Sequence, residues 1–186
     1  MNIVLIGYRG SGKTTIGRAL ARRLGWGFVD TDVEIVGRAG MTIREIFERE
    51  GEAGFRDRES AVVRDVAARG GRGAAEAGLV VAAGGGAVLR VENVAALKAT
   101  GKVVWLKAPV EVLHERISAD AATAAMRPNL TAAGGLEEIR ALLAVREEAY
   151  RGAADEVLEV GGMGVEEAVD RLAGGNGESE RRHAKA

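Results

Sequence analysis

The sequence predicts an α/β fold in which a five-stranded parallel β-sheet carries helices on both faces. Five short apolar runs alternate along the chain with longer segments of helical periodicity. Such alternation favours a parallel sheet, because each connecting segment crosses one face of the sheet as a helix before the next strand begins. The predicted strands cover residues 3–6, 28–29, 79–83, 103–106 and 157–160.

The composition fits a single domain without a membrane segment. The chain has 186 residues, of which 47% are hydrophobic, enough for one substantial core but not for a second independent one. Its net charge of −1 creates no field that would attract nucleic acid or an anionic membrane, and no apolar run approaches the roughly 20 residues of a membrane span. The absence of cysteine excludes disulfides and thiolate chemistry. We expect a monomeric, cytoplasmic protein that binds neither nucleic acid nor membranes.

A glycine-rich turn directly after the first strand has the sequence of a complete P-loop. Residues 7–14 read GYRGSGKT and lead into an apolar helical segment. Glycines let backbone N–H groups turn inward, and the N-terminus of the following helix adds partial positive charge, so the turn forms a cradle for phosphates. Lys13 is predicted to reach the β- and γ-phosphates of a nucleotide, and the hydroxyl of Thr14 to bind Mg²⁺. The predicted nucleotide contacts here are Gly10, Ser11, Gly12, Lys13, Thr14 and Thr15.

Two carboxylates follow the second predicted strand. The chain has neither the Asn-Lys-x-Asp motif that reads guanine nor an Asp-x-x-Gly switch, which argues against a GTP switch. The third strand ends in glycines 84–86 rather than in a metal-binding aspartate, so Asp30 and Asp32 are the candidate acidic groups. Residues two apart in an extended segment project to the same side, so both are expected to face the phosphate cradle. Asp30 is predicted to help hold Mg²⁺ and Asp32 to orient an acceptor hydroxyl. The alternative is that Asp32 only caps the next helix.

An extra helical piece is predicted between the second and third strands. Thr42 and Glu45 form a capping box that opens a helix through Glu50, Gly51 ends it, and a second helix follows over residues 52–69. One crossover helix would be enough to connect two parallel strands. The segment from about residue 32 to 69 is therefore a candidate substrate-binding insert.

Small residues mark a second special segment, around Arg127-Pro128. An Ala-rich stretch precedes this pair and a Gly-bearing stretch follows it, which predicts a mobile lid over about residues 116–135. The last part of the chain, residues 174–186, is rich in glycine and charge. We expect one domain over residues 1–173, followed by a disordered tail.

Taken in order, these motifs resemble those of the shikimate kinase family. Beside the P-loop they are FVDTD at 28–32, TIREIF at 42–47, GEAGFRDRE at 51–59, GGG at 84–86 and Arg127-Pro128. The resemblance covers about residues 2–150. It implies a five-stranded parallel sheet of the nucleoside-monophosphate-kinase type. It also implies transfer of the γ-phosphoryl of ATP, with Mg²⁺, to the 3-hydroxyl of shikimate in aromatic amino-acid biosynthesis.

The resemblance assigns expected roles to individual residues. It implies that Asp32 contacts the acceptor hydroxyls, that Arg56 and Arg146 clamp the shikimate carboxylate, and that Gly85, between Gly84 and Gly86, lies against the ring. A guanidinium grips a carboxylate with two parallel hydrogen bonds, and a glycine lets a ligand approach the backbone. Without the motif, Arg56 would read as a solvated helix charge and the glycines as an ordinary left-handed turn.

Nucleotide contacts outside the P-loop are also implied. Arg127 matches the family's lid arginine, which closes over the phosphates and stabilises charge in the transition state; the alternative is a solvated charge at a helix end. Arg116 is a further candidate near the nucleotide. Met163 lies in a Gly-rich segment without polar side chains, where backbone contacts to adenine are inferred. The segment after Arg146 lacks the family's usual proline two residues later.

Two other functions remain possible from the sequence. A different small-molecule kinase of this fold, such as a gluconate kinase, would also pair a P-loop with a carboxylate after the second strand. Arg56 and the glycine triplet argue against it. A catalytically silent nucleotide-binding relative is the alternative from another class, and the presence of Lys13, Asp32 and Arg127 together argues against that.

Overall fold

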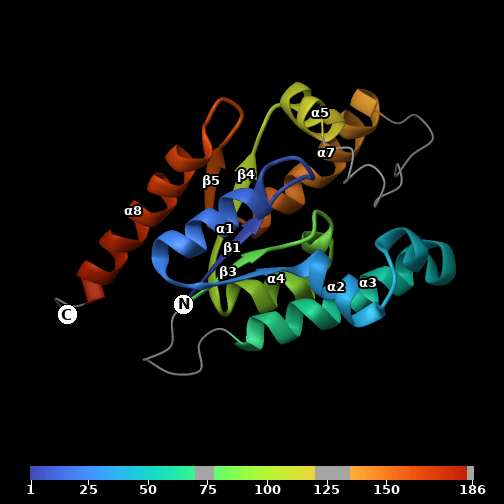
Figure 1. Cartoon of the computed structure of the whole chain (residues 1–186), viewed down its shortest axis with the longest axis horizontal. Helices are drawn as coiled ribbons and strands as arrows, with labels where there is room; N and C mark the ends of the chain where they lie inside the picture. Colours follow the sequence, from blue (N-terminus) through green and yellow to red (C-terminus); the bar gives the residue numbers. More distant parts are fainter. Residues whose placement is uncertain (70–77, 120–134, 184–186) are drawn as a thin grey trace.

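The computed structural model describes residues 1–69, 78–119 and 135–183 and has the predicted architecture (Figure 1). Five parallel strands form one sheet in the order β2-β3-β1-β4-β5. Their bounds are β1 Asn2–Ile6, β2 Gly27–Asp30, β3 Leu79–Ala82, β4 Gly101–Lys107 and β5 Glu156–Glu159. Every strand predicted from the sequence is present, and the α/β fold with a five-stranded parallel sheet is confirmed.

The central strand is buried on both faces. All five residues of β1 are buried between β3 and β4, which explains why β1 is apolar at consecutive positions rather than at alternate ones. Ile3 and Leu5 belong to one hydrophobic cluster, and Val4 and Ile6 belong to the other. Because neighbouring side chains point to opposite faces, this one strand supports both halves of the core.

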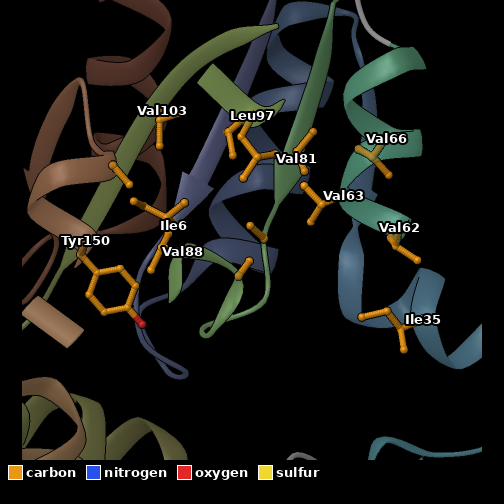
Figure 2. Close-up of a cluster of buried hydrophobic side chains, with 14 of the residues drawn as sticks. Ile6, Ile35, Val62, Val63, Val66, Val81, Val88, Leu97, Val103 and Tyr150 are labelled. Carbon is orange, nitrogen blue, oxygen red and sulfur yellow. The ribbon is translucent and has the colours of Figure 1, made fainter. Parts of the chain in front are cut away.

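Helices cover both faces of the sheet. One cluster packs β1 and β4 against α1 (Lys13–Leu24), α5 (Val110–Ala119) and α8 (Val165–His183). The other cluster involves α3 (Ile43–Arg69), α4 (Val91–Lys98) and the C-terminal part of α7 (Gly135–Ala153), and Figure 2 shows its side chains converging on the sheet. Among the described residues, no helix is long and apolar enough to cross a lipid bilayer.

The predicted insert is built from α2 (Thr31–Ala39) and α3. The capping box is present: the Thr42 hydroxyl accepts from the Glu45 backbone N–H, and the Glu45 carboxylate accepts from the Thr42 backbone N–H at 2.7 Å. The helix is interrupted at Gly51, whose φ of 69° and ψ of −174° are not helical. Gly51 therefore ends one helical segment and begins another, as the sequence predicts.

The end of the chain corrects one prediction. Helix α8 continues through His183, so the backbone of residues 174–183 is helical where composition predicted a disordered tail, and the boundary drawn at residue 173 falls inside this helix. Ala168, Val169 and Leu172 bury the first part of α8 in the core. Once a turn is anchored in this way, each added residue gains one backbone hydrogen bond at no further nucleation cost. A prediction from composition considers only how much apolar surface a segment can bury, so it leaves out these added backbone hydrogen bonds.

Two glycines inside helices give a matched test of the packing. A Cβ on Gly17 of α1 would lie 2.7 Å from Cε2 of Phe28 and 3.2 Å from Cδ1 of Leu5, whereas a Cβ on Gly37 of α2 would meet nothing within 4 Å. We expect Gly17→Ala to lower the free energy of unfolding by about 1–3 kcal/mol through overpacking. Gly37→Ala should raise it by up to about 1 kcal/mol because alanine favours helix. Urea unfolding measures both, and equal effects would contradict this account of α1 packing.

Candidate active site

The P-loop joins β1 to α1 at the carboxyl edge of the sheet. Gly7, Gly10 and Gly12 have φ of 141°, 81° and 90°, which other residues rarely adopt. A Cβ on Gly7 would also lie 2.6 Å from the carbonyl oxygen of Leu106 on β4. The first turn of α1 contains no acidic residue, so its N–H groups and partial positive charge are not neutralised from within the helix. The loop thus has the geometry of an anion cradle.

Lys13 contacts the P-loop backbone, and Thr14 contacts the end of β2. The Lys13 ammonium donates to the carbonyl oxygens of Gly7 and Tyr8, both at 2.9 Å, which holds it over the loop. The Thr14 hydroxyl donates to Oδ2 of Asp30 at 2.7 Å. In the cradle itself, the Ser11 hydroxyl is buried and has no hydrogen-bond partner among the described residues. A buried orphan hydroxyl is costly unless a ligand satisfies it.

Asp30 and Asp32 are arranged differently from the expectation. Strand β2 ends at Asp30, and Asp32 lies in the first turn of α2, not in an extended segment. The helix cap is Asp30, whose Oδ1 accepts from the Asp32 backbone N–H at 3.0 Å, so the alternative role of Asp32 as the cap is wrong as well. The hydroxyl of Thr31, between them, accepts from the Gly84 backbone N–H at 2.8 Å. Both carboxylates nevertheless line one cavity with the P-loop.

This large cavity has a volume of about 680 Å³. Such a volume suits a nucleotide-sized ligand. Arg116 lies on its wall and donates to the carbonyl oxygen of Val160, just after β5. Of the residues predicted to bind nucleotide or metal, those that line it are Gly10, Gly12, Lys13, Thr14, Thr15, Asp30, Arg116 and Met163.

A smaller cavity of about 70 Å³ lies beside it, between the insert, the glycine triplet and α7. Its lining brings together five residues that the sequence predicted for the acceptor site, although they lie far apart in the chain: Asp32, Arg56, Gly85, Gly86 and Arg146. Asp32 also lines the large cavity. The two cavities therefore adjoin at this carboxylate.

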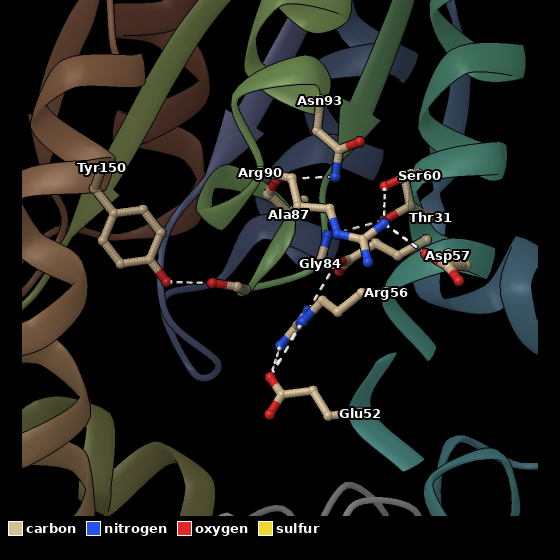
Figure 3. A network of polar contacts seen from close by, with 12 residues as sticks. Thr31, Glu52, Arg56, Asp57, Ser60, Gly84, Ala87, Arg90, Asn93 and Tyr150 are labelled. Atoms are coloured by element: carbon tan, nitrogen blue, oxygen red, sulfur yellow. Dashed lines mark hydrogen bonds and ion pairs between the residues drawn. The ribbon is translucent and has the colours of Figure 1, made fainter. Parts of the chain in front are cut away.

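Arg56 is not a solvated helix charge. Its side chain is only 11% exposed, and its Nη1 donates to Glu59 Oε2 at 2.7 Å. A weaker bond to Glu52 is visible in Figure 3. Burial raises the pKa of Glu59, while the Arg56 guanidinium opposes this shift. The pair holds the guanidinium at the cavity wall, and the sequence-based alternative for Arg56 is wrong.

Arg146 reaches the cavity from α7 without the family's usual proline. Helix α7 is continuous through Ala153, and Arg146 is 9% exposed, with its guanidinium carbon 5.9 Å from the centre of the Tyr8 ring. One turn later, the Tyr150 hydroxyl donates to the Gly85 carbonyl oxygen at 2.6 Å (Figure 3). Burial raises the pKa of Tyr150 to about 12, so this hydroxyl remains a donor at neutral pH. The packing of α7 thus fixes the direction of the chain around Arg146, which the family's proline would otherwise have fixed.

The glycine triplet is not a left-handed turn, because none of Gly84, Gly85 and Gly86 has a positive φ. Side chains of the site occupy the space that a Cβ would need. A Cβ on Gly84 would lie 2.8 Å from carboxylate oxygens of both Asp32 and Glu59, and one on Gly86 would collide with the Arg56 guanidinium. Gly85 has more room, since its nearest contact would be 3.5 Å. Gly84 and Gly86 are therefore needed to seat the charged groups.

Comparison with known proteins now decides the family. The shikimate kinase family model matches residues 9–173. This chain belongs to the shikimate kinase family. Shikimate kinases transfer phosphate from ATP, so the chain is of the kinase class whose P-loop it carries.

Relatives and solved structures agree with this placement. A shikimate kinase of Symbiobacterium thermophilum is 49% identical over 154 residues, covering 83% of each chain. One of Geobacter sulfurreducens is 42% identical and covers 92% of this chain and 88% of its own. A structure of the shikimate kinase of Acinetobacter baumannii in complex with shikimate superposes with a TM-score of 0.82 at 38% identity, covering 92% and 90% of the two chains. A gluconokinase of Sinorhizobium meliloti, at 18% identity and TM-score 0.60, shares the fold alone.

Sequence reasoning missed several cavity residues of this family member. Tyr8 and Arg9 line the small cavity from the P-loop, and Glu59 lines it from α3. Phe47 and Phe55 stack at 4.7 Å between ring centres on either side of Gly51. The spacing of Glu59 three residues after Arg56 was an available signal for an ion pair on one helix face. Arg127 and most of the predicted lid lie outside the described residues.

The glycine triplet gives a test. Gly86→Ala should displace the Arg56 guanidinium and raise the KM for shikimate by about tenfold or more, because a charge-assisted contact is lost. The KM for ATP should change little. Gly152→Ala, where a Cβ meets nothing within 4 Å, is the matched control and should leave both constants unchanged. An unchanged KM for shikimate in Gly86→Ala would show that Arg56 is not seated as described.

Proposed function

We propose that this chain transfers the γ-phosphoryl of ATP to the 3-hydroxyl of shikimate, giving shikimate 3-phosphate and ADP. The observation that carries the proposal is that the Asp32 carboxylate lies where a nucleotide-sized cavity meets a small cavity lined by arginines. An acceptor in the small cavity would present its hydroxyl to Asp32 and its carboxylate to the arginines. The shikimate bound to the Acinetobacter relative supports this acceptor.

The protein's part in the transfer is positioning and electrostatics. A transferring phosphoryl group passes through a loose transition state, so little covalent chemistry is required of the enzyme. Lys13, held over the P-loop, would meet the phosphate charge, and Asp32 would align the acceptor hydroxyl and take its proton. The proposal assigns contact with shikimate to Arg56, Arg146 and the glycine triplet.

The residues present fit a Mg²⁺ ion at the mouth of the cradle. The hydroxyl of Thr14 and the carboxylate of Asp30 place two hard oxygen donors 2.7 Å apart beside Lys13. Proteins usually hold Mg²⁺ by one or two such groups together with substrate phosphates and water. When bound there, the ion would neutralise charge on the phosphates. Asp30 already orients Thr14 through one oxygen and the first turn of α2 through the other.

Further features complete the proposal. Arg127 would close over the phosphates from a lid, and adenine would lie against Met163 and the backbone around it, at the far end of the large cavity. We also propose that the chain acts as a monomer, because residues of one chain line both cavities. Gel filtration measures this last point directly.

A coupled assay of ADP release tests the function. Purified protein with ATP and Mg²⁺ should release ADP when shikimate is added. Gluconate, in a parallel reaction, should give only the background rate. Turnover of gluconate in place of shikimate would favour the other small-molecule kinase, and no turnover of either would favour a silent nucleotide-binding relative.

The role of Asp32 is open to a direct test. Asp32→Asn keeps the size of the side chain but removes its capacity to accept a proton, so kcat should fall by about 10²-fold or more. The helix cap is supplied by Asp30, so folding and ATP affinity should remain nearly intact. Melting temperature and nucleotide titration provide these controls. Near-normal turnover would contradict the assignment.

The carboxylate grip can be tested at Arg56. Arg56→Ala should weaken shikimate binding by about 2–4 kcal/mol with little effect on ATP, because a buried charged contact is lost. Arg56→Lys should recover only part of this, since an ammonium lacks the planar fork. Arg58→Ala, which removes a more exposed arginine paired with Glu50 outside both cavities, is the matched control. Equal losses of ATP and shikimate affinity would point to a folding defect instead.

A further inference from the structure

Arg9 occupies an unusual position between the two cavities. Among the described residues that line them, only Arg9, Asp32 and Ile43 border both. Lys13 borders only the large cavity, and Arg56 and Arg146 border only the small one. Within the described part of the chain, Arg9 is therefore the one cation at the boundary that a phosphoryl group would cross on its way to an acceptor.

The Arg9 side chain is fixed by α7. Its Nη2 donates to Oε1 of Glu138 at 2.8 Å, although the two residues lie 129 positions apart in the sequence. The Glu138 side chain is 0% exposed and that of Arg9 is 12% exposed. A buried ion pair gains little net stability, because the attraction only repays the loss of hydration. A gain in stability therefore does not explain the Arg9–Glu138 pair. A role in fixing the Arg9 guanidinium at the boundary between the cavities does explain it.

Arg9 also has an unused donor. Its Nε is buried and has no hydrogen-bond partner among the described residues. The guanidinium carbon lies 5.9 Å from the centre of the Tyr8 ring, at the same distance as that of Arg146. Both guanidiniums also line the small cavity, and a cavity lined by two guanidiniums suits an anion.

We propose that Arg9 is a catalytic residue that binds the phosphoryl group during transfer, and that Glu138 is its positioning residue. The inference rests on the proposed function. As the bond from the γ-phosphorus to the bridging oxygen breaks and the acceptor oxygen bonds to phosphorus, the hydroxyl proton passes to Asp32. Arg9 remains protonated and contacts a peripheral oxygen of the phosphoryl group. A donor that is already in place needs no reorganisation when charge moves, which is why such groups stabilise transition states strongly.

The test compares Arg9→Met, Arg9→Lys and a control, Arg23→Met, which removes an exposed arginine of α1 paired with Asp170. Arg9→Met should lower kcat by about 10²-fold or more. The separate affinities for ADP and shikimate should stay within about threefold, because the contact forms only during transfer. ADP with aluminium fluoride and shikimate imitates the phosphoryl group during transfer. The Arg9→Met variant should no longer bind this combination tightly. Arg9→Lys should recover part of kcat, and Arg23→Met should match the wild type.

The positioning role of Glu138 is tested by comparing its substitution with that of Arg9 and with the double variant. Removing Arg9 alone takes away the cation that faces the buried Glu138 carboxylate, so the double variant Arg9→Met/Glu138→Leu is measured beside Arg9→Met as a control for folding. Glu138→Gln should lower kcat less than Arg9→Met does. The double variant should be no slower than Arg9→Met if Glu138 affects transfer by positioning Arg9.

Three results would overturn the inference. Unchanged kcat in the folded double variant would make the pair purely structural. A raised KM for shikimate with kcat kept would place Arg9 on the acceptor carboxylate. Additive losses from Arg9 and Glu138 would remove the positioning role. Turnover of shikimate by the wild-type protein tests the proposed function separately, so failure there is distinguishable from failure at Arg9.

Discussion

The parallel direction of all five strands is the constraint on which the site depends. Because every strand runs the same way, the carboxyl ends of β1, β2 and β3 meet at one edge, and the segments that follow them must lie side by side. The P-loop follows β1, Asp30 and Asp32 follow β2, and the glycine triplet follows β3. The bond that Asp30 accepts from the Thr14 hydroxyl and the bond that Thr31 accepts from the Gly84 N–H then fix these segments to one another. The sheet brings the groups to the edge, and short polar contacts set their final positions.

The features that the sequence predicts well are those whose cause is local. The P-loop, the capping box at Thr42 and the break at Gly51 each depend on residues within one turn of one another. The placement of Asp32 failed because either aspartate could cap α2, and the choice depends on a contact from Asp30 to Thr14, which is 16 residues away. Arg9 and Glu138 were missed for the same reason at longer range. The helical end of α8 was missed because composition does not count hydrogen bonds that continue from an anchored turn.

The small cavity collects opposite charges in very little space. Three guanidiniums, of Arg9, Arg56 and Arg146, share the cavity lining with the carboxylates of Asp32 and Glu59. Burial there makes every charge more costly to leave unpaired and every contact to a ligand stronger. The raised pKa of Glu59 is one sign of this environment. An acceptor that brings its own carboxylate would add a further charged partner for these guanidiniums, whereas a neutral sugar would add none.

Tyr150 shows that core packing and ligand recognition share one side chain. Its ring is fully buried and stacks on Trp105 of β4, with 5.6 Å between ring centres, while its hydroxyl holds the Gly85 carbonyl at the cavity wall. For core packing alone, phenylalanine would fill the space of the Tyr150 ring equally well. At the cavity, the same change would release the Gly85 peptide from its hydrogen bond. Repacking the core of this enzyme for heat resistance would thus reshape a recognition surface through a residue whose ring lies in the core.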